Sequence, residues 1–134
     1  MIHGIGIDSV EIKRFHHWHM YSSTQLKRIF SVSEIVYCLE SPILSAERFA
    51  ARFAVREAFF KALYAAYPHV KIPFLTSCKA ISIPRQDDGL ARLIIDWNYL
   101  LIKTEHSIKT PLHPHLSLTH TKLTATALVI LEEI

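Results

Sequence analysis

The segment SAERFAARFAVREAFFKALYAAY, residues 45–67, has the clearest helical periodicity of the chain. Alanines recur every four residues from Ala50 to Ala62 and phenylalanines accompany them, which predicts a long helix with a wide apolar stripe. Ser45 is placed to cap the N-terminus of this helix, and Pro68 ends it because the residue before a proline avoids the α region. The rest of the fold is expected to pack against this helix.

Charged side chains interrupt the apolar pattern of the predicted helix. Glu57 and Lys61 are four residues apart in the favoured order, so one interpretation is an ordinary surface ion pair. Phe59 and Phe60 lie directly beside this pair and favour a partly buried setting, where charged groups usually bind a ligand or take part in chemistry.

A second informative segment is the N-terminal one, where alternation predicts a strand over residues 2–12. Gly4, Gly6 and Asp8 share one face of this strand. Two glycines on one face weaken a strand unless another backbone or a ligand must approach closely, so we expect a helix or a ligand beside Asp8. The alternative is that Asp8 only caps a turn at the end of the strand.

The remaining pattern mixes short helices and strands. We expect helices near 24–29, 33–39 and within 96–109, an extended chain after Pro68, a hairpin of strands 80–83 and 90–95 turning at Asp87-Asp88-Gly89, and strands at 115–121 and 124–132. A strand, then helices, then mostly strands predicts an α+β fold in a single domain spanning residues 1–134.

Composition narrows the class of protein. Half of the 134 residues are hydrophobic and 20% are charged, which indicates a globular chain, and the net charge of +3 suits an acidic partner or a phosphate ligand without indicating nucleic acid. Cys38 and Cys78 have no metal-site spacing, no signal peptide is apparent, and no apolar run approaches the ~20 residues that a bilayer requires. We therefore expect a cytoplasmic protein that does not enter the membrane.

The histidine-rich segment 16–19 suggests a metal cluster at first sight. Adjacent residues on a helix diverge by about 100°, so His16 and His17 do not converge on one ion. We interpret this segment as a solvent-exposed face.

Polar residues also alternate near the C-terminus. His115, Ser117 and Thr119 share one face of the predicted strand 115–121, and His120 follows. Such hydroxyl and imidazole groups are donors for a phosphate, although a solvent-facing edge strand produces the same pattern.

Three motifs together carry a family resemblance: GIGIDSVEIKRF at 4–15, RFAVREAFFKAL at 52–63 and HLSLTHT at 115–121. In this order and spacing the chain resembles the holo-[acyl-carrier-protein] synthases, the small bacterial type of 4′-phosphopantetheinyl transferase. The resemblance implies a small antiparallel sheet packed against a long central helix, a homotrimer with active sites at subunit interfaces, and a role in fatty acid biosynthesis. It also implies transfer of phosphopantetheine from coenzyme A to a serine of apo-acyl carrier protein, with release of adenosine 3′,5′-bisphosphate.

The resemblance assigns roles to residues of the first two motifs. Asp8 and Glu57 match the carboxylates that hold Mg²⁺, a cation that prefers oxygen ligands and retains water. Glu57, directly or through a metal-bound water, is the candidate base for the serine hydroxyl, and Lys61 is the candidate to stabilise the departing bisphosphate. Arg56 stands where many members have a lysine and keeps the charge.

The resemblance also implies a coenzyme A site and a docking surface. Ser117, Thr119 and His120 are expected to contact the coenzyme A phosphates, plausibly from the neighbouring subunit, and Arg48 and Arg52 are candidates for the 3′-phosphate. The basic segment with Lys13 and Arg14, joined by Lys27 and Arg28, matches the surface that meets the acidic carrier protein.

The chain departs from the family pattern at several places. Val10 stands where larger relatives have another carboxylate, YAAYPHVKIPF replaces a glycine-containing loop after the helix, and only Gly89 remains of a Gly-Lys-Pro turn. Two other functions remain open from the residues alone: a Mg²⁺-dependent phosphohydrolase using the same carboxylates, and a small basic binding module. A binding module would tolerate Asp8→Ala but not Arg14→Ala, whereas a transferase would lose activity with either change.

Overall fold

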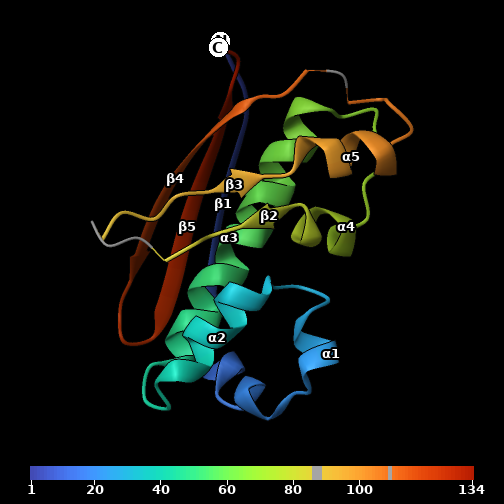
Figure 1. The fold of residues 1–134 in the computed structure, drawn as a ribbon. Coiled ribbons are helices and arrows are strands. Elements are labelled where there is room, and N and C mark those ends of the chain that lie inside the picture. The colour runs from blue at the N-terminus through green and yellow to red at the C-terminus, as the bar shows by residue number, and fades with distance from the viewer. Residues whose placement is uncertain (86–88, 109) are drawn as a thin grey trace.

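The long helix α3 (Ser45–Ala66) lies along one face of a three-stranded antiparallel sheet (Figure 1). The sheet consists of β1 (Ile2–Glu11), β4 (His113–His120) and β5 (Thr124–Glu132), in the order β1-β5-β4. The structure is a computed structural model that describes residues 1–85, 89–108 and 110–134. The predicted α+β fold, with a small antiparallel sheet against a long helix, is confirmed.

Shorter elements connect the sheet and the long helix. They are two 3₁₀ helices (Ile12–Phe15 and Trp18–Met20), α1 (Ser23–Leu26), α2 (Val32–Glu40), α4 (Phe74–Lys79), β2 (Ile81–Ser82), β3 (Ile94–Ile95) and α5 (Trp97–Lys103). None of the helices in the described part of the chain combines the length and hydropathy needed to cross a bilayer.

The glycines of β1 allow the strand to contact the helix backbone. A Cβ on Gly4 would lie 2.0 Å from the carbonyl oxygen of Ala62, and one on Gly6 would lie 1.9 Å from that of Ala58. Any side chain there would displace the helix, since real Cβ contacts are not this short. The predicted close approach on the face that carries Asp8 is thus made by α3.

The opposite face of the sheet has no helix over it among the described residues (Figure 1). Ile5 and Ile7 are 55% and 58% exposed there. They pair in register with Ile130 and Leu128 of β5, so apolar side chains form a continuous exposed surface across two strands.

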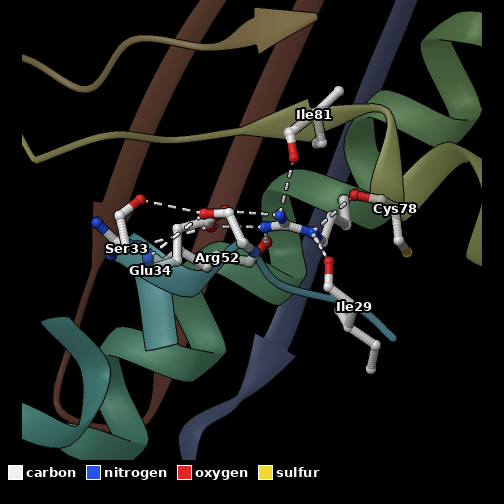
Figure 2. A network of polar contacts seen from close by, with 8 residues as sticks. Ile29, Ser33, Glu34, Arg52, Cys78 and Ile81 are labelled. Carbon is white, nitrogen blue, oxygen red and sulfur yellow. Dashed lines mark hydrogen bonds and ion pairs between the residues drawn. The ribbon is translucent and has the colours of Figure 1, made fainter. Parts of the chain in front are cut away.

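A buried ion pair connects α2 to α3. Arg56 is fully buried and donates two hydrogen bonds of 2.7 Å to the carboxylate of Glu34. Its guanidinium also donates to the carbonyl oxygens of Ile29, Cys78 and Ile81, so one side chain ties three segments together (Figure 2). Burial opposes ionisation of Glu34, but its hydrogen bonds and the charge of Arg56 outweigh burial, and the pKa of Glu34 lies below its ordinary value.

The start of α3 differs from the prediction. Leu44, not Ser45, occupies the N-cap position, because residues 42–44 form a turn that leads directly into the helix. Ser45 is the first helical residue, and its buried hydroxyl has no hydrogen-bond partner. Helix α2 also begins before the predicted Ser33, since Ser31 provides a capping box with Glu34.

The prediction of an extended chain after Pro68 is wrong at α4. Ser77 hydrogen-bonds back to Pro73 and Phe74, which closes a short helix. The ring of Phe74 packs edge-on against Phe60 of α3, with centroids 5.4 Å apart. Tertiary packing therefore specifies this turn of helix more strongly than local propensity.

The second pair of strands is shorter than predicted. β2 and β3 pair antiparallel through Ile81 and Ile95, but each strand has two residues. The predicted turn residues Asp87 and Asp88 lie outside the described residues, and Gly89 has a φ of 74°. Asp96 caps α5 by accepting a hydrogen bond from Tyr99 N, which confirms a helix within 96–109.

Candidate active site

Asp8 and Lys61 form an ion pair between β1 and α3. Lys61 Nζ donates to Asp8 Oδ1 at 2.8 Å and to the carbonyl oxygen of Ile7 at 3.0 Å. The Asp8 side chain is only 12% exposed, whereas that of Lys61 is 54% exposed. The sequence suggested a pair between Glu57 and Lys61, but the partner of this lysine is the aspartate on the strand.

Glu57 lies one helical turn before Lys61 and interacts with Asp8. Burial and the neighbouring Asp8 carboxyl raise the pKa of Glu57 to about 7, against smaller opposing effects of Arg14 and Lys61. The other oxygen of Asp8, Oδ2, is buried without a hydrogen-bond partner. Two carboxyl groups in this position repel each other unless a proton or a cation lies between them.

The donor set fits a hard divalent cation better than a transition metal. Mg²⁺ is commonly bound by one or two carboxylates, with substrate phosphates and waters as its other ligands. Asp8 and Glu57 offer this set, and the unpartnered Asp8 Oδ2 is an available oxygen ligand. The described residues contain no cluster of three or more His, Cys, Asp or Glu side chains that could hold a metal, and Val10 is buried in the core. The histidine segment 16–19 therefore forms no such cluster either.

An aromatic surface borders the carboxylates. Phe60 and Phe74, with Glu57 and Lys61, line a cavity of about 220 Å³. The Arg14 guanidinium lies 5.9 Å from the ring centre of Phe53, on the same helix as Glu57. A basic group, two carboxyls and an ammonium thus lie beside an apolar surface.

Comparison with known proteins shows the family of this chain. The family model described as "4′-phosphopantetheinyl transferase superfamily" matches residues 4–126, which include Asp8, Glu57 and Lys61. This chain belongs to that superfamily. The family resemblance found in the three sequence motifs is therefore confirmed.

Relatives of the transferase match it over nearly their whole length. The holo-[acyl-carrier-protein] synthase of Treponema denticola is 36% identical over 132 residues, covering 98% of this chain and 99% of the relative. That of Syntrophus aciditrophicus is 36% identical over 133 residues, covering 98% of this chain and 97% of the relative.

Solved structures agree with the fold. The Bacillus anthracis holo-(acyl-carrier-protein) synthase in complex with CoA (3′,5′-ADP) has a TM-score of 0.73 and 29% identity, over 100% of this chain and 99% of that one. The Helicobacter pylori enzyme in complex with coenzyme A has a TM-score of 0.67 and 25% identity, over 96% of this chain and 99% of that one.

A second group of residues in the transferase borders a cavity of about 510 Å³. Arg52 of α3 and Ser117 and His120 of β4, all singled out from the sequence, line this cavity. Tyr37 and Arg85 line it too. Three of the five residues expected to bind coenzyme A therefore lie around one cavity.

The other two lie outside that lining. Arg48 contacts Tyr37, which does line the cavity: the Arg48 guanidinium stacks on the Tyr37 ring and donates to the Tyr37 carbonyl oxygen at 2.8 Å. Thr119 lies on the outer face of β4, opposite Thr126 of β5. The imidazole of His120 itself lies against the carboxylate of Glu47 in α3.

The structure changes the interpretation of Arg56. This arginine stands directly before Glu57, yet its guanidinium is fully buried against Glu34 and not exposed beside the carboxylates. Its charge is used to hold the fold together. Adjacent helix positions point about 100° apart, which explains how neighbours in sequence serve two different sites.

Sequence reasoning missed Tyr37 and Arg85. Tyr37 meets the arginines of α3, and Arg85 meets Tyr37, only through tertiary packing, and neither residue belongs to a recognisable motif. A tyrosine on the apolar helix α2 gives no local signal of contact with a guanidinium 11 to 48 residues away.

Proposed function

We propose that this chain transfers the 4′-phosphopantetheine group of coenzyme A to a serine of apo-acyl carrier protein in a Mg²⁺-dependent reaction, releasing adenosine 3′,5′-bisphosphate. The single observation that carries the proposal is the meeting of Asp8 and Glu57, from two distant motifs of the family, beside Lys61. The names of the relatives and their complexes with coenzyme A support the same reaction.

The carboxylates of Asp8 and Glu57 would hold the Mg²⁺. When bound, the ion would neutralise negative charge that develops on the pyrophosphate during transfer. Before Mg²⁺ binds, the Lys61 ammonium must move away from Asp8, or the Asp8 carboxylate must bind both Lys61 and Mg²⁺. Lys61 can do so because its side chain is long and half-exposed.

The transfer forms one P–O bond and breaks another. The serine oxygen of the carrier protein attacks the phosphorus that bears pantetheine, and the bond from this phosphorus to the bridging oxygen breaks. The serine proton passes to the carboxylate of Glu57, either directly or through a metal-bound water. Lys61, on the same face of the helix, stabilises the charge that remains on adenosine 3′,5′-bisphosphate.

The carrier protein would dock on the basic segment after β1. Arg14 is close enough to lower the pKa of Glu57, which places a positive charge at the edge of the carboxylate pair. Lys13 is exposed and forms an ion pair with Glu11 at 3.1 Å. An acidic carrier protein would thus be attracted toward the reacting groups, mostly through a faster association.

A homotrimer would unite the two halves of the site. Asp8 faces α3, whereas Ser117 and Thr119 point to the opposite face of the sheet, so their side chains diverge within one subunit. That opposite face exposes Ile5 and Ile7, an apolar surface suited to burial against a neighbouring subunit. A neighbour packed there would present its own hydroxyls to coenzyme A bound near Asp8.

Mass spectrometry tests the proposed function. The protein is mixed with coenzyme A, Mg²⁺ and apo-acyl carrier protein, and we expect the carrier protein to gain one phosphopantetheine group. A Ser→Ala carrier protein lacking the acceptor serine is the control. Absence of the adduct with every divalent cation would refute the proposal, and bisphosphate release without carrier protein would indicate a phosphohydrolase instead.

A further inference from the structure

Tyr37 of α2 is surrounded by three arginines. The guanidinium carbons of Arg48, Arg52 and Arg85 lie 3.9, 4.4 and 5.4 Å from the centre of its ring. A cation is attracted to an aromatic face within about 6 Å, most strongly where water is excluded. Arg48 and Arg52 meet that condition, since their side chains are 17% and 10% exposed.

Like charges gathered so closely repel each other unless something compensates. Glu40 offers partial compensation from one side, at 3.1 Å from Arg85 and 3.7 Å from Arg48. Arg52 receives less: its Nε is buried without a hydrogen-bond partner, and its closest carboxylate oxygen, on Glu34, is 3.8 Å away. That carboxylate is already engaged by Arg56.

The cavity beside this cluster is shaped for a polar ligand. Arg52 and Arg85 line it together with His120, whose imidazole is a hydrogen-bonding group. Guanidinium groups bind phosphate oxygens through paired, charge-assisted hydrogen bonds. A dianionic phosphate in this cavity would offset the positive charge of the arginines and relieve the repulsion among them.

We propose that Tyr37 is a positioning residue whose ring, in contact with Arg48, holds Arg52 and Arg85 at this cavity, and that the cluster binds the 3′-phosphate end of coenzyme A. The inference rests on the proposed function for its choice of ligand. Its new elements are the ring of Tyr37, which orients the guanidiniums, and Arg85, which adds a third positive charge. The phosphate replaces Glu40 as the partner of Arg85, whose side chain is 62% exposed.

Assays with two substrates distinguish a positioning role of Tyr37 from a purely structural one. Coenzyme A and dephospho-coenzyme A differ only in the 3′-phosphate, so only a group that acts on that phosphate changes their ratio. In transfer assays with apo-acyl carrier protein, we expect Tyr37→Leu to raise the KM for coenzyme A about tenfold, with kcat unchanged and little effect on dephospho-coenzyme A. Tyr37→Phe keeps the ring and should restore wild-type values.

Two further variants complete the design. Arg85→Gln changes an exposed side chain, so it should fold normally and show the same selective loss for coenzyme A even if Tyr37→Leu folds poorly. Tyr99→Leu removes a ring that lies 5.7 Å from Lys103 on α5, away from the cavity, and is the matched control with no expected effect. An equal loss for both substrates, no loss for either, or equal impairment by Tyr37→Phe and Tyr37→Leu would overturn the inference.

A binding measurement distinguishes failure of the inference from failure of the proposed function. Calorimetry with adenosine 3′,5′-bisphosphate and with adenosine 5′-monophosphate requires no transfer. We expect wild-type protein to prefer the bisphosphate and Tyr37→Leu to lose about tenfold of that preference. A wild-type protein without this preference contradicts the inference, whereas selective binding without any transfer would contradict only the proposed reaction.

Discussion

Gly6 of β1 lies against the backbone of Ala58 in α3, so closely that a Cβ would be 1.9 Å from the Ala58 carbonyl oxygen. The contact fixes the distance between strand and helix at the point where Asp8 and Glu57 meet. Asp8 follows Gly6 by two residues and therefore shares its face of the strand, while Glu57 directly precedes Ala58. Close backbone packing thus positions the proposed metal site.

Gly6→Ala should strongly destabilise the protein. The added methyl group meets backbone atoms that cannot move independently, and overpacking of this kind costs about 1–3 kcal/mol or more. Urea unfolding measures the loss. Gly89→Ala is the matched control: its Cβ would meet nothing within 4 Å, so only the positive φ of 74° opposes it, at a cost of about 1–2 kcal/mol.

Stability should depend on pH through Glu57. The pKa of Glu57 is raised from 4.5 to about 7, so between these values the folded chain retains a proton that the unfolded chain has lost. The contribution of Glu57 to the free energy of unfolding therefore falls as pH rises from about 4.5 to 7 in metal-free protein. Glu57→Gln should abolish this contribution, and Asp8→Asn should reduce it, in unfolding curves recorded at several pH values. An unchanged pH profile in Glu57→Gln would show that another group is responsible.

Lys61→Met should impair transfer without unfolding the protein. Its side chain is half-exposed, so its removal changes packing little, but the departing bisphosphate loses a positive charge. Loss of one such group commonly lowers kcat about 10²–10³-fold. Steady-state assays and thermal unfolding should separate the two effects, and a proportional loss of stability would argue for a structural role.

Arg56→Met should show the opposite pattern. It leaves Glu34 buried without its partner, and breaking a buried ion pair in this way costs about 3–5 kcal/mol. We expect a large fall in the free energy of unfolding measured with urea. If Arg56→Met were as stable as wild type but inactive, the arginine would belong to the active site after all.

Arg14→Glu should weaken the use of the carrier protein more than that of coenzyme A. Reversal of the charge beside Glu57 repels an acidic partner and slows association, most strongly at low ionic strength. Transfer assays at two salt concentrations measure this as a higher KM for carrier protein. His19→Glu is the matched control, since this histidine is exposed in the adjoining 3₁₀ helix.

Much of the fold was predictable because local sequence patterns indicate the two surfaces of its main contact, which β1 makes with α3. The two glycines of β1 and the alanine spacing of α3 each indicated a surface suited to close approach, and each surface packs against the other. Asp8 and Glu57 could be paired from the sequence only because a family resemblance joined two motifs. Their distance along the chain gives no such information.

The parts of the fold and of the site that the sequence did not predict are determined by tertiary packing. Helix α4 exists because Phe74 contacts Phe60, and no strong capping or periodic signal precedes it. Arg56 forms an ion pair with Glu34, which is 22 residues away in the sequence. Tyr37 and Arg85 also come into contact only in the folded chain. Charged residues on one helix therefore looked alike in sequence, while the structure separates them into a stabilising pair, a cationic cavity and the proposed catalytic group.

Counting bound divalent ions tests the central claim most directly. Mn²⁺ serves as a paramagnetic substitute for Mg²⁺, and electron paramagnetic resonance follows its binding to the protein in the presence of saturating coenzyme A, against a blank without protein. We predict one protein-dependent ion per chain for the wild type, and its loss in both Asp8→Asn and Glu57→Gln. Binding that is equally tight in wild type and both variants would contradict a site formed by these two carboxylates.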